Sequence, residues 1–230
     1  MDYQLVIFDI AGTTVHDGDA VGTCLRAALD HVAGLAFDRD EVNAVMGIPK
    51  PVAIRGLLEG RLGRAAEAAR VEAVHRDFER RMLAHYHTSE DVKEVPGASD
   101  VFDALRRRGV KVALDTGFGR AITDGVLGRL GWNVPGVLDA TVTADDVAAG
   151  RPAPDMVYRA MELTGVRDAK RVVKVGDTPS DLLEGTAAGC GMVVGVTSGS
   201  HTAGELRPHP HTGLVESVRD VPALLSGGMS

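Results

Sequence analysis

The chain has 230 residues, of which 44% are hydrophobic, 25% charged and 4% aromatic. These values are ordinary for a soluble globular protein of one or two domains, and the net charge of −7 argues against nucleic acid or an anionic membrane as a partner. Cys24 and Cys190 are too few and too far apart for a disulfide framework or a zinc site. We see no secretory leader and no apolar run of about 20 residues that could span a bilayer. We therefore expect a cytoplasmic protein.

The first expected element is a strand that runs from residue 5 to Asp9. Its apolar, β-branched run is typical of a strand buried on both faces. Asp9 stands where the strand ends and the Gly12-Thr13-Thr14 loop begins. In an open parallel sheet, ligands bind at the carboxyl ends of strands. On this stretch alone, Asp9 is equally well read as a turn-forming carboxylate.

The next segment, residues 17–91, has the spacing of helices and contains no strand pattern. Apolar residues recur three or four positions apart over 19–33, a short helix is expected from Asp38 to Met46, and a long amphipathic helix over 64–87. Between them, two prolines bracket Lys50 and make 46–51 a rigid turn, after which a helix resumes through 54–58. This segment is predicted to be an all-helical cap domain.

After residue 95, helices and strands alternate. We predict strands over 110–116, 137–143, 171–177 and 191–197, and helices over 98–108, 120–130, 155–165, 179–188 and 221–225. Such alternation indicates an α/β fold with a doubly wound parallel sheet and right-handed crossovers. The α/β core domain would comprise residues 1–16 and 92–230, with the cap inserted after the first strand.

Polar side chains follow several of these strands and would meet at one edge of the sheet. Neighbouring carboxylates repel one another unless a cation joins them, and oxygen ligands favour Mg²⁺. Hydroxyl groups, a guanidinium and glycine N–H groups suit a phosphoryl group. Each residue alone could be a helix cap, a turn residue or a surface charge. The set is Asp9, Asp115, Thr116, Gly117, Arg151, Asp177 and Asp181.

In this order, the motifs resemble those of the haloacid dehalogenase superfamily of phosphotransferases, over essentially the whole chain. The resemblance implies that Asp9 is a nucleophile that accepts a phosphoryl group, and that Thr116 binds phosphoryl oxygens. Arg151 would offset negative charge. Mg²⁺ would be held by Asp9, Asp177 and the backbone carbonyl of Ala11, with Asp181 assisting through water.

Two departures from the common phosphatase pattern narrow the resemblance. Most phosphatases of the superfamily have a second aspartate two residues after the nucleophile, as a general acid, but this chain has Ala11 there. The usual lysine of the third motif is Arg151. Both features are similar to those of the phosphonatase branch, the phosphonoacetaldehyde hydrolases. Met46, Gly47 and Lys50 match the branch's MGxxK pattern, which implies that Lys50 forms a Schiff base with an aldehyde.

The absence of a general acid at Ala11 and the presence of Lys50 are both consistent with cleavage of a C–P bond. Cleavage of a C–P bond expels carbon, so the step needs an electron sink instead of an acid, and a protonated imine on Lys50 provides one. Phosphonatases usually have a histidine three residues after this lysine, but here the residue is Ala53. The proton transfer that this histidine performs would then fall to another group or to water, or not occur. His16, His75, His85 and His87 are candidates only by proximity.

These residues are compatible with three functions. The first is Mg²⁺-dependent hydrolysis of a 2-oxoalkylphosphonate through Lys50 and Asp9. The second is an ordinary phosphate monoester phosphatase, for example of the phosphoglycolate type, in which Lys50 only binds the substrate anion. The third is a phosphate-binding protein without catalysis. A small-molecule phosphonate or phosphate is the expected partner, and a homodimer through the cap is left open against a monomer.

Overall fold

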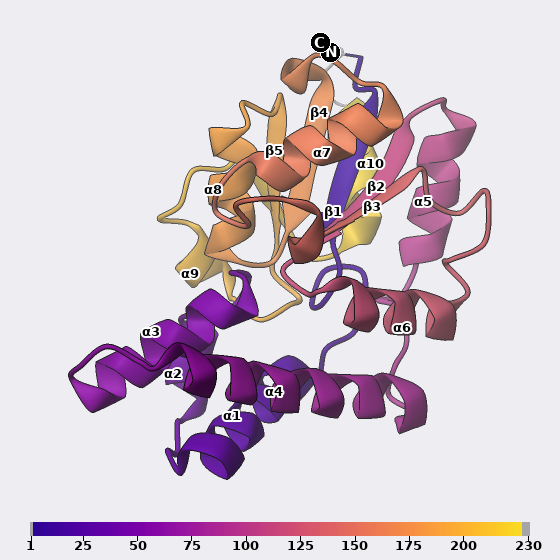
Figure 1. Ribbon diagram of the computed structural model, residues 1–230. Coiled ribbons are helices and arrows are strands. Elements are labelled where there is room, and N and C mark those ends of the chain that lie inside the picture. Colours follow the sequence, from indigo (N-terminus) through magenta and orange to yellow (C-terminus); the bar gives the residue numbers. More distant parts are fainter. Residues whose placement is uncertain (1, 227–230) are drawn as a thin grey trace.

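The computed structural model describes residues 2–226, and its centre is a six-stranded sheet (Figure 1). All neighbouring strands are parallel, in the order β3-β2-β1-β4-β5-β6. The strands are β1 (Leu5–Asp9), β2 (Lys111–Thr116), β3 (Ala140–Thr143), β4 (Val172–Gly176), β5 (Met192–Val196) and β6 (Gly213–Val215). The predicted α/β class with a parallel sheet is confirmed.

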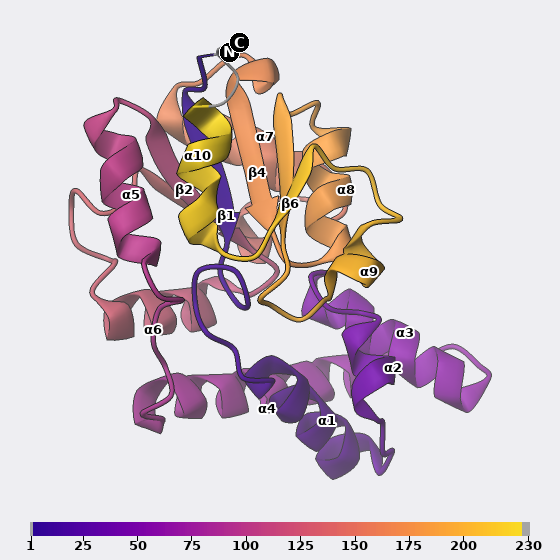
Figure 2. The ribbon, with the colours of Figure 1, turned by 180° about the vertical axis from the view of Figure 1, so that it is seen from behind.

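Helices cover both faces of this sheet. One face packs against α7 (Asp155–Thr164) and α8 (Pro179–Ala187), and the other against α5 (Ala98–Arg107), on which α10 (Val221–Ser226) lies (Figures 1 and 2). Along β1 the buried side chains alternate between these faces, as strand geometry requires: Val6 and Phe8 join the apolar cluster on one side, Leu5 and Ile7 the cluster on the other. The strand that carries Asp9 is therefore fixed from both sides.

Four helices form an insert between β1 and α5: α1 (Ala20–Ala33), α2 (Arg39–Asn43), α3 (Lys50–Leu62) and α4 (Ala68–Thr88). They lie beyond the carboxyl ends of the strands (Figure 1). The apolar face of α1 packs against α4 of the same chain, so it is buried without a second copy. The insert confirms the predicted cap helices; its boundaries at 16/17 and 91/92, and a cap-mediated homodimer, stay predictions.

The two chain segments that join the insert to the sheet lie side by side. The backbone N–H of His16 donates to the carbonyl of Lys93 at 2.9 Å, and the N–H of Val95 donates to the carbonyl of Thr14 at 2.8 Å. An antiparallel bridge between Val15 and Glu94 completes this contact. The insert therefore enters and leaves through one paired connection.

Several element boundaries differ from the predictions. The strand expected over 137–143 begins at Ala140, since residues 135–138 form a local turn-like bridge; β6 and α9 (Ala203–Leu206) were not predicted. Lys50 was expected within a turn but is the first residue of α3, because Pro51 is compatible with the first helical turn.

The remaining elements are α6 (Arg120–Leu130) and three short 3-10 helices at Ala144–Asp146, Ala169–Arg171 and Val218–Asp220. Among residues 2–226, no helix combines the length and apolar character that a membrane crossing demands.

Candidate active site

Three carboxylates meet where the central strands end. Asp9 is the last residue of β1, Asp177 directly follows β4, and Asp181 lies in the first turn of α8. One oxygen from each lies within 4.8 Å of the others, and all three side chains are buried. The parallel register of β1 with β4 brings the strand ends together, as the sequence predicted.

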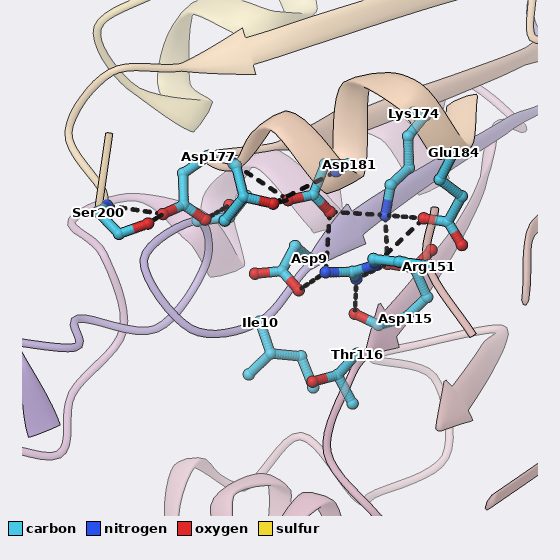
Figure 3. A network of polar contacts seen from close by, with 12 residues as sticks. Asp9, Ile10, Asp115, Thr116, Arg151, Lys174, Asp177, Asp181, Glu184 and Ser200 are labelled. Carbon is cyan, nitrogen blue, oxygen red and sulfur yellow. Dashed lines mark hydrogen bonds and ion pairs between the residues drawn. The ribbon is translucent and has the colours of Figure 1, made fainter. Parts of the chain in front are cut away.

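Arg151 and Lys174 neutralise a second group of acids behind Asp9 (Figure 3). A terminal nitrogen of Arg151 lies 2.7 Å from Asp9 Oδ1 and 2.9 Å from Asp181 Oδ1, while the guanidinium also pairs with Asp115. Lys174 Nζ pairs with Asp115, lies 3.1 Å from Asp181 Oδ1 and 3.0 Å from Glu184 Oε2. Arg151 therefore touches the predicted nucleophile from a position fixed by other acids.

Asp177 is held by hydroxyl and backbone donors. The hydroxyl of Thr13 donates to Asp177 Oδ1 at 2.9 Å, and the backbone N–H and hydroxyl of Ser200 both donate to Oδ2 at 2.7 Å. A Cβ atom at Gly12 or Gly199 would overlap this carboxylate. Loops after β1 and β5 thus fix its orientation.

Burial and mutual repulsion make these acids hard to ionise without a cation. Burial raises the pKa of Asp9 to about 8, although Arg151 opposes the shift. Burial, together with the neighbouring Asp181, raises the pKa of Asp177 to about 6. Burial also disfavours ionisation of Asp115, but Arg151 and Lys174 outweigh it and lower the Asp115 pKa. The cluster of Asp9, Asp177 and Asp181 therefore fits a divalent cation, whereas Asp115 already has Arg151 and Lys174 as partners.

A cavity of about 210 Å³ opens in front of Asp9, between the sheet edge and the insert. The core contributes residues from the loops after β1, β2 and β5, with Arg151 from the loop after β3 and Thr178 from the loop after β4. The insert contributes the start of α1 and residues within the segment 39–50. The predicted residues that line it are Asp9, Ala11, Met46, Gly47, Lys50, Thr116, Gly117 and Arg151. The three exceptions, Asp115, Asp177 and Asp181, lie behind the cavity wall within the buried acid clusters.

Lys50 enters this cavity from the insert and is 4% exposed. Its Nζ lies 6.0 Å from the ring centre of Phe78 and 5.8 Å from that of Phe118. Burial lowers the pKa of Lys50 to about 8, against the opposing effect of Asp9 and Asp17. An amine in this setting is partly neutral near pH 7, and so able to act as a nucleophile.

Gly47 brings the insert into direct contact with the sheet edge. It adopts a φ of +81°, and a Cβ atom there would overlap the hydroxyl of Thr178. Thr178 in turn caps α8 and donates to Asp181 Oδ2 at 2.6 Å. Thr116 accepts from the backbone N–H of Phe118 at 3.2 Å, which orients the loop after β2.

Four residues of this site were missed from the sequence: Thr13, Lys174, Glu184 and Ser200. Lys174 gave a usable signal, because a lysine inside an otherwise apolar strand must be buried and so needs acidic partners. Thr13 lies in the quoted motif but received no role. Glu184 and Ser200 reach the site only through packing of α8 and the loop after β5.

Comparison with known proteins defines the class of the protein. The family model of haloacid dehalogenase-like hydrolases matches residues 3–189. The chain belongs to this family, as its motifs predicted. Its relatives include phosphonoacetaldehyde hydrolase of Bacillus cereus (strain AH187), which is 35% identical over 218 residues, covering 89% of this chain and 79% of the relative.

Two solved structures share the fold over almost the whole chain. A hydrolase from Pseudomonas syringae has a TM-score of 0.87 at 21% identity, with 99% of this chain and 100% of that chain covered. A phosphonoacetaldehyde hydrolase-like protein from Oleispira antarctica has a TM-score of 0.84 at 22% identity, covering 99% of this chain and 92% of that chain.

Proposed function

We propose that this hydrolase cleaves the carbon–phosphorus bond of phosphonoacetaldehyde or a related 2-oxoalkylphosphonate. The observation that carries the proposal is the buried amine of Lys50, which shares one small cavity with the carboxylate of Asp9. The likeness to phosphonoacetaldehyde hydrolases supports the same substrate class.

The environment of Lys50 favours the neutral amine that imine formation requires. With a pKa of about 8, about one tenth of the lysine is neutral at pH 7. At the ordinary value of 10.5 the neutral fraction would be about one in 3,000. The amine adds to the substrate carbonyl carbon, water leaves, and a protonated C=N bond forms.

Asp9, which lines the same cavity at the end of β1, then attacks phosphorus. An O–P bond forms between Asp9 and the phosphonate, and the C–P bond breaks. The electron pair of that bond becomes a C=C bond while the C=N π pair moves onto the Lys50 nitrogen, which gives an enamine. Water hydrolyses the acyl phosphate on Asp9. The enamine then takes a proton at carbon, and a second water releases the carbonyl product and restores Lys50.

The acid cluster fits Mg²⁺ as the cofactor. Asp9, Asp177 and the backbone carbonyl of Ala11 would hold the ion, with Asp181 behind them. Burial, and after it the neighbouring carboxylates, raise the pKa values of Asp9 and Asp177, and a divalent cation would favour the ionised form of both. When bound, Mg²⁺ supplies electrostatic screening of the phosphonate and carboxylate oxygens. Arg151 adds positive charge 2.7 Å from Asp9, independently of the ion.

Ala11 supports C–P over P–O cleavage. It lines the cavity beside Asp9 and has no proton to give to an alkoxide leaving group, a role whose loss typically costs about two to four orders of magnitude. The proposed leaving group is a carbon whose electrons pass to the imine, so no acid is needed at this position.

The test uses phosphonoacetaldehyde with the wild-type protein and the variant Lys50→Arg, which keeps the positive charge but forms no imine. We expect the wild type to release phosphate and, after borohydride reduction, to carry the reduced substrate adduct on Lys50, located by mass spectrometry. Lys50→Arg should release at least about 10⁴-fold less phosphate, because the electron sink is lost. Lys93→Arg, an exposed lysine, is the matched control and should behave as wild type.

The alternatives give different results in the same assay. A phosphatase would release phosphate from phosphoglycolate or a similar ester, and its activity would survive Lys50→Arg. A binding protein would release no phosphate from any substrate and would retain phosphate after Asp9→Asn. Phosphate release from phosphonoacetaldehyde that survives Lys50→Arg would overturn the proposal.

A further inference from the structure

Imine formation on Lys50 requires a group that moves protons, and Ala53 cannot be that group. The amine must lose a proton before it attacks, and the carbinolamine hydroxyl must gain one before it leaves as water. Ala53 is buried and apolar. Within the part of the chain that the structure describes, the titratable residues lining the cavity are Asp9, His16, Asp17, Asp19, Arg39, Lys50 and Arg151.

Most of these groups are already engaged. Asp9 is paired with Arg151 and is the proposed nucleophile. Asp19 Oδ2 lies 2.8 Å from a terminal nitrogen of Arg26 and 3.7 Å from Arg39 Nε, so it is already paired with two arginines. Arginines do not exchange protons near neutral pH.

His16 is also a poor fit, because its side chain is exposed. Asp17 is different from the other cavity carboxylates. It is partly buried just before α1, and Oδ1 accepts from the backbone N–H of Val21 at 3.2 Å. Among the described carboxylates lining the cavity, Asp17 alone has no cationic partner within 4.0 Å.

We propose that Asp17 is the general acid and base for imine formation on Lys50, a role that rests on the proposed function. Asp17 and Lys50 line the same cavity from neighbouring parts of the insert. Because Lys50 Nζ lies more than 4.0 Å from the carboxylate, one water in the cavity carries the proton from the Lys50 ammonium to Asp17, and the neutral amine forms a C–N bond with the carbonyl carbon. After an internal proton shift from nitrogen to oxygen, Asp17 returns its proton to the hydroxyl. The C–O bond breaks, water leaves, and the nitrogen lone pair completes the protonated imine.

The electrostatic surroundings of Asp17 agree with this exchange. Burial raises the Asp17 pKa, as does Asp19, whereas Lys50 and His85 oppose the shift. Lys50 in turn is made more acidic by burial and by Arg151, against Asp9 and Asp17. The two pKa values therefore move toward each other, which lowers the free-energy cost of passing a proton between the two side chains.

The test isolates imine formation from phosphoryl transfer. In an Asp9→Asn background the imine can form but the C–P bond stays intact, so borohydride trapping on Lys50 reports the first step alone. Adding Asp17→Asn keeps the acceptor for Val21 and removes the exchangeable proton. We expect the trapping rate to fall about 10²- to 10⁴-fold. Asp17→Glu should restore most of the rate.

The matched control is Asp30→Asn, which removes an exposed carboxylate of α1 that does not line the cavity. Its trapping rate should equal that of the Asp9→Asn background. Should Asp17→Asn fail to fold by circular dichroism, Asp17→Ala is assayed with and without formate. Formate should restore trapping in Asp17→Ala and have no effect in Asp30→Ala.

Two outcomes separate this inference from the proposed function. No adduct on Lys50 in Asp9→Asn alone would overturn the proposed function. An adduct that forms in Asp17→Asn as fast as in Asp9→Asn alone, or an Asp17→Ala variant indifferent to formate, would overturn the role of Asp17 and leave the proposed function intact.

Discussion

Lys174 has no access to the cavity, yet it determines how the site is charged. It is 0% exposed in the middle of β4 and lies among Asp115, Asp181 and Glu184. Burial disfavours its ammonium, but these acids outweigh burial together with the repulsion from Arg151, and they raise the Lys174 pKa. Arg151 pairs with the same three acids and also with Asp9, so Lys174 and Arg151 share the charge of one buried acid cluster.

Replacing Lys174 by methionine should therefore destabilise the protein strongly. The substitution keeps the volume but leaves three buried acids with one cation fewer, and removing one partner of a buried ion pair typically costs about 3–5 kcal/mol. Urea unfolding followed by circular dichroism measures the change. Lys111→Met is the control: Lys111 also pairs with an aspartate but is 50% exposed, so a loss below about 1 kcal/mol is expected. Equal losses in both variants would contradict this account.

The residues that the sequence revealed are those with a recognisable local pattern. Asp9 ends an apolar strand before a glycine loop, and Lys50 follows a Met-Gly pair at a fixed spacing, so both could be proposed before the structure. Asp17 and Glu184 could not, since their surroundings come from packing between segments distant in sequence. Lys174 could have been found, because no lysine is buried without partners.

At the scale of elements, the contact between segment 46–50 and the start of α8 links the insert to the acid cluster. Gly47 lies against Thr178, and a Cβ atom at Gly150 would overlap the ring of Pro49. Two glycines thus allow the insert and the core loops to approach closely at Gly47 and Pro49, just before Lys50. The position of Lys50 over the cavity depends on both approaches.

Gly47→Ala should consequently reduce activity more than stability. Its side chain would push segment 46–50 away from Thr178 and displace Lys50, so kcat/KM for phosphonoacetaldehyde should fall at least about tenfold. Gly63→Ala is the matched control. Gly63 also has a positive φ, of +64°, but open space around it, so alanine there should cost about 1 kcal/mol of stability with kcat/KM unchanged. Similar kcat/KM values for both variants would show that the contact is not needed.

Element types were predictable and element limits were less so. The predicted alternation of helices and strands after residue 95 is borne out because each element carries its own apolar period. β6 was missed because it has three residues and no alternating pattern; it is a strand only because β5 lies beside it. The start of α3 was placed too late because proline was read as a break, although it fits the first turn.

For the whole molecule, a bound divalent cation should appear as thermal stabilisation. A ligand that binds only the folded state at 100 times its Kd contributes about 2.7 kcal/mol, which for a chain of this size corresponds to a Tm increase of about 5–10 °C. We expect millimolar MgCl₂ to raise the Tm of the wild type and to leave that of Asp177→Asn unchanged. Asp103→Asn, on an exposed surface, should keep the full increase. A Tm increase that survives Asp177→Asn would place the cation elsewhere.

Sheet and insert share one apolar cluster, which contains Phe8 and Val112 from the sheet and Leu25 and Phe78 from the insert. The rings of Phe78 and Phe118 lie 6.5 Å apart across the boundary, and their centres lie 6.0 and 5.8 Å from Lys50 Nζ. The wall of the cavity is thus also part of the hydrophobic core. The sequence could indicate the core domain and the insert, but not that one apolar cluster runs through both.

The paired connection at 14–16 and 93–95 has a consequence for how such a protein can diversify. The backbone hydrogen bonds of His16 and Val95 hold the two connecting segments together. The chain therefore leaves the sheet and returns to it at one point, whatever helices lie between the two segments. A helical segment of another length or composition could be exchanged there, provided that it again covers the apolar cluster which sheet and insert share. Under the proposed function, the nucleophile Asp9 would stay with the sheet, while Lys50, which would form the imine with the substrate, would belong to the exchangeable segment.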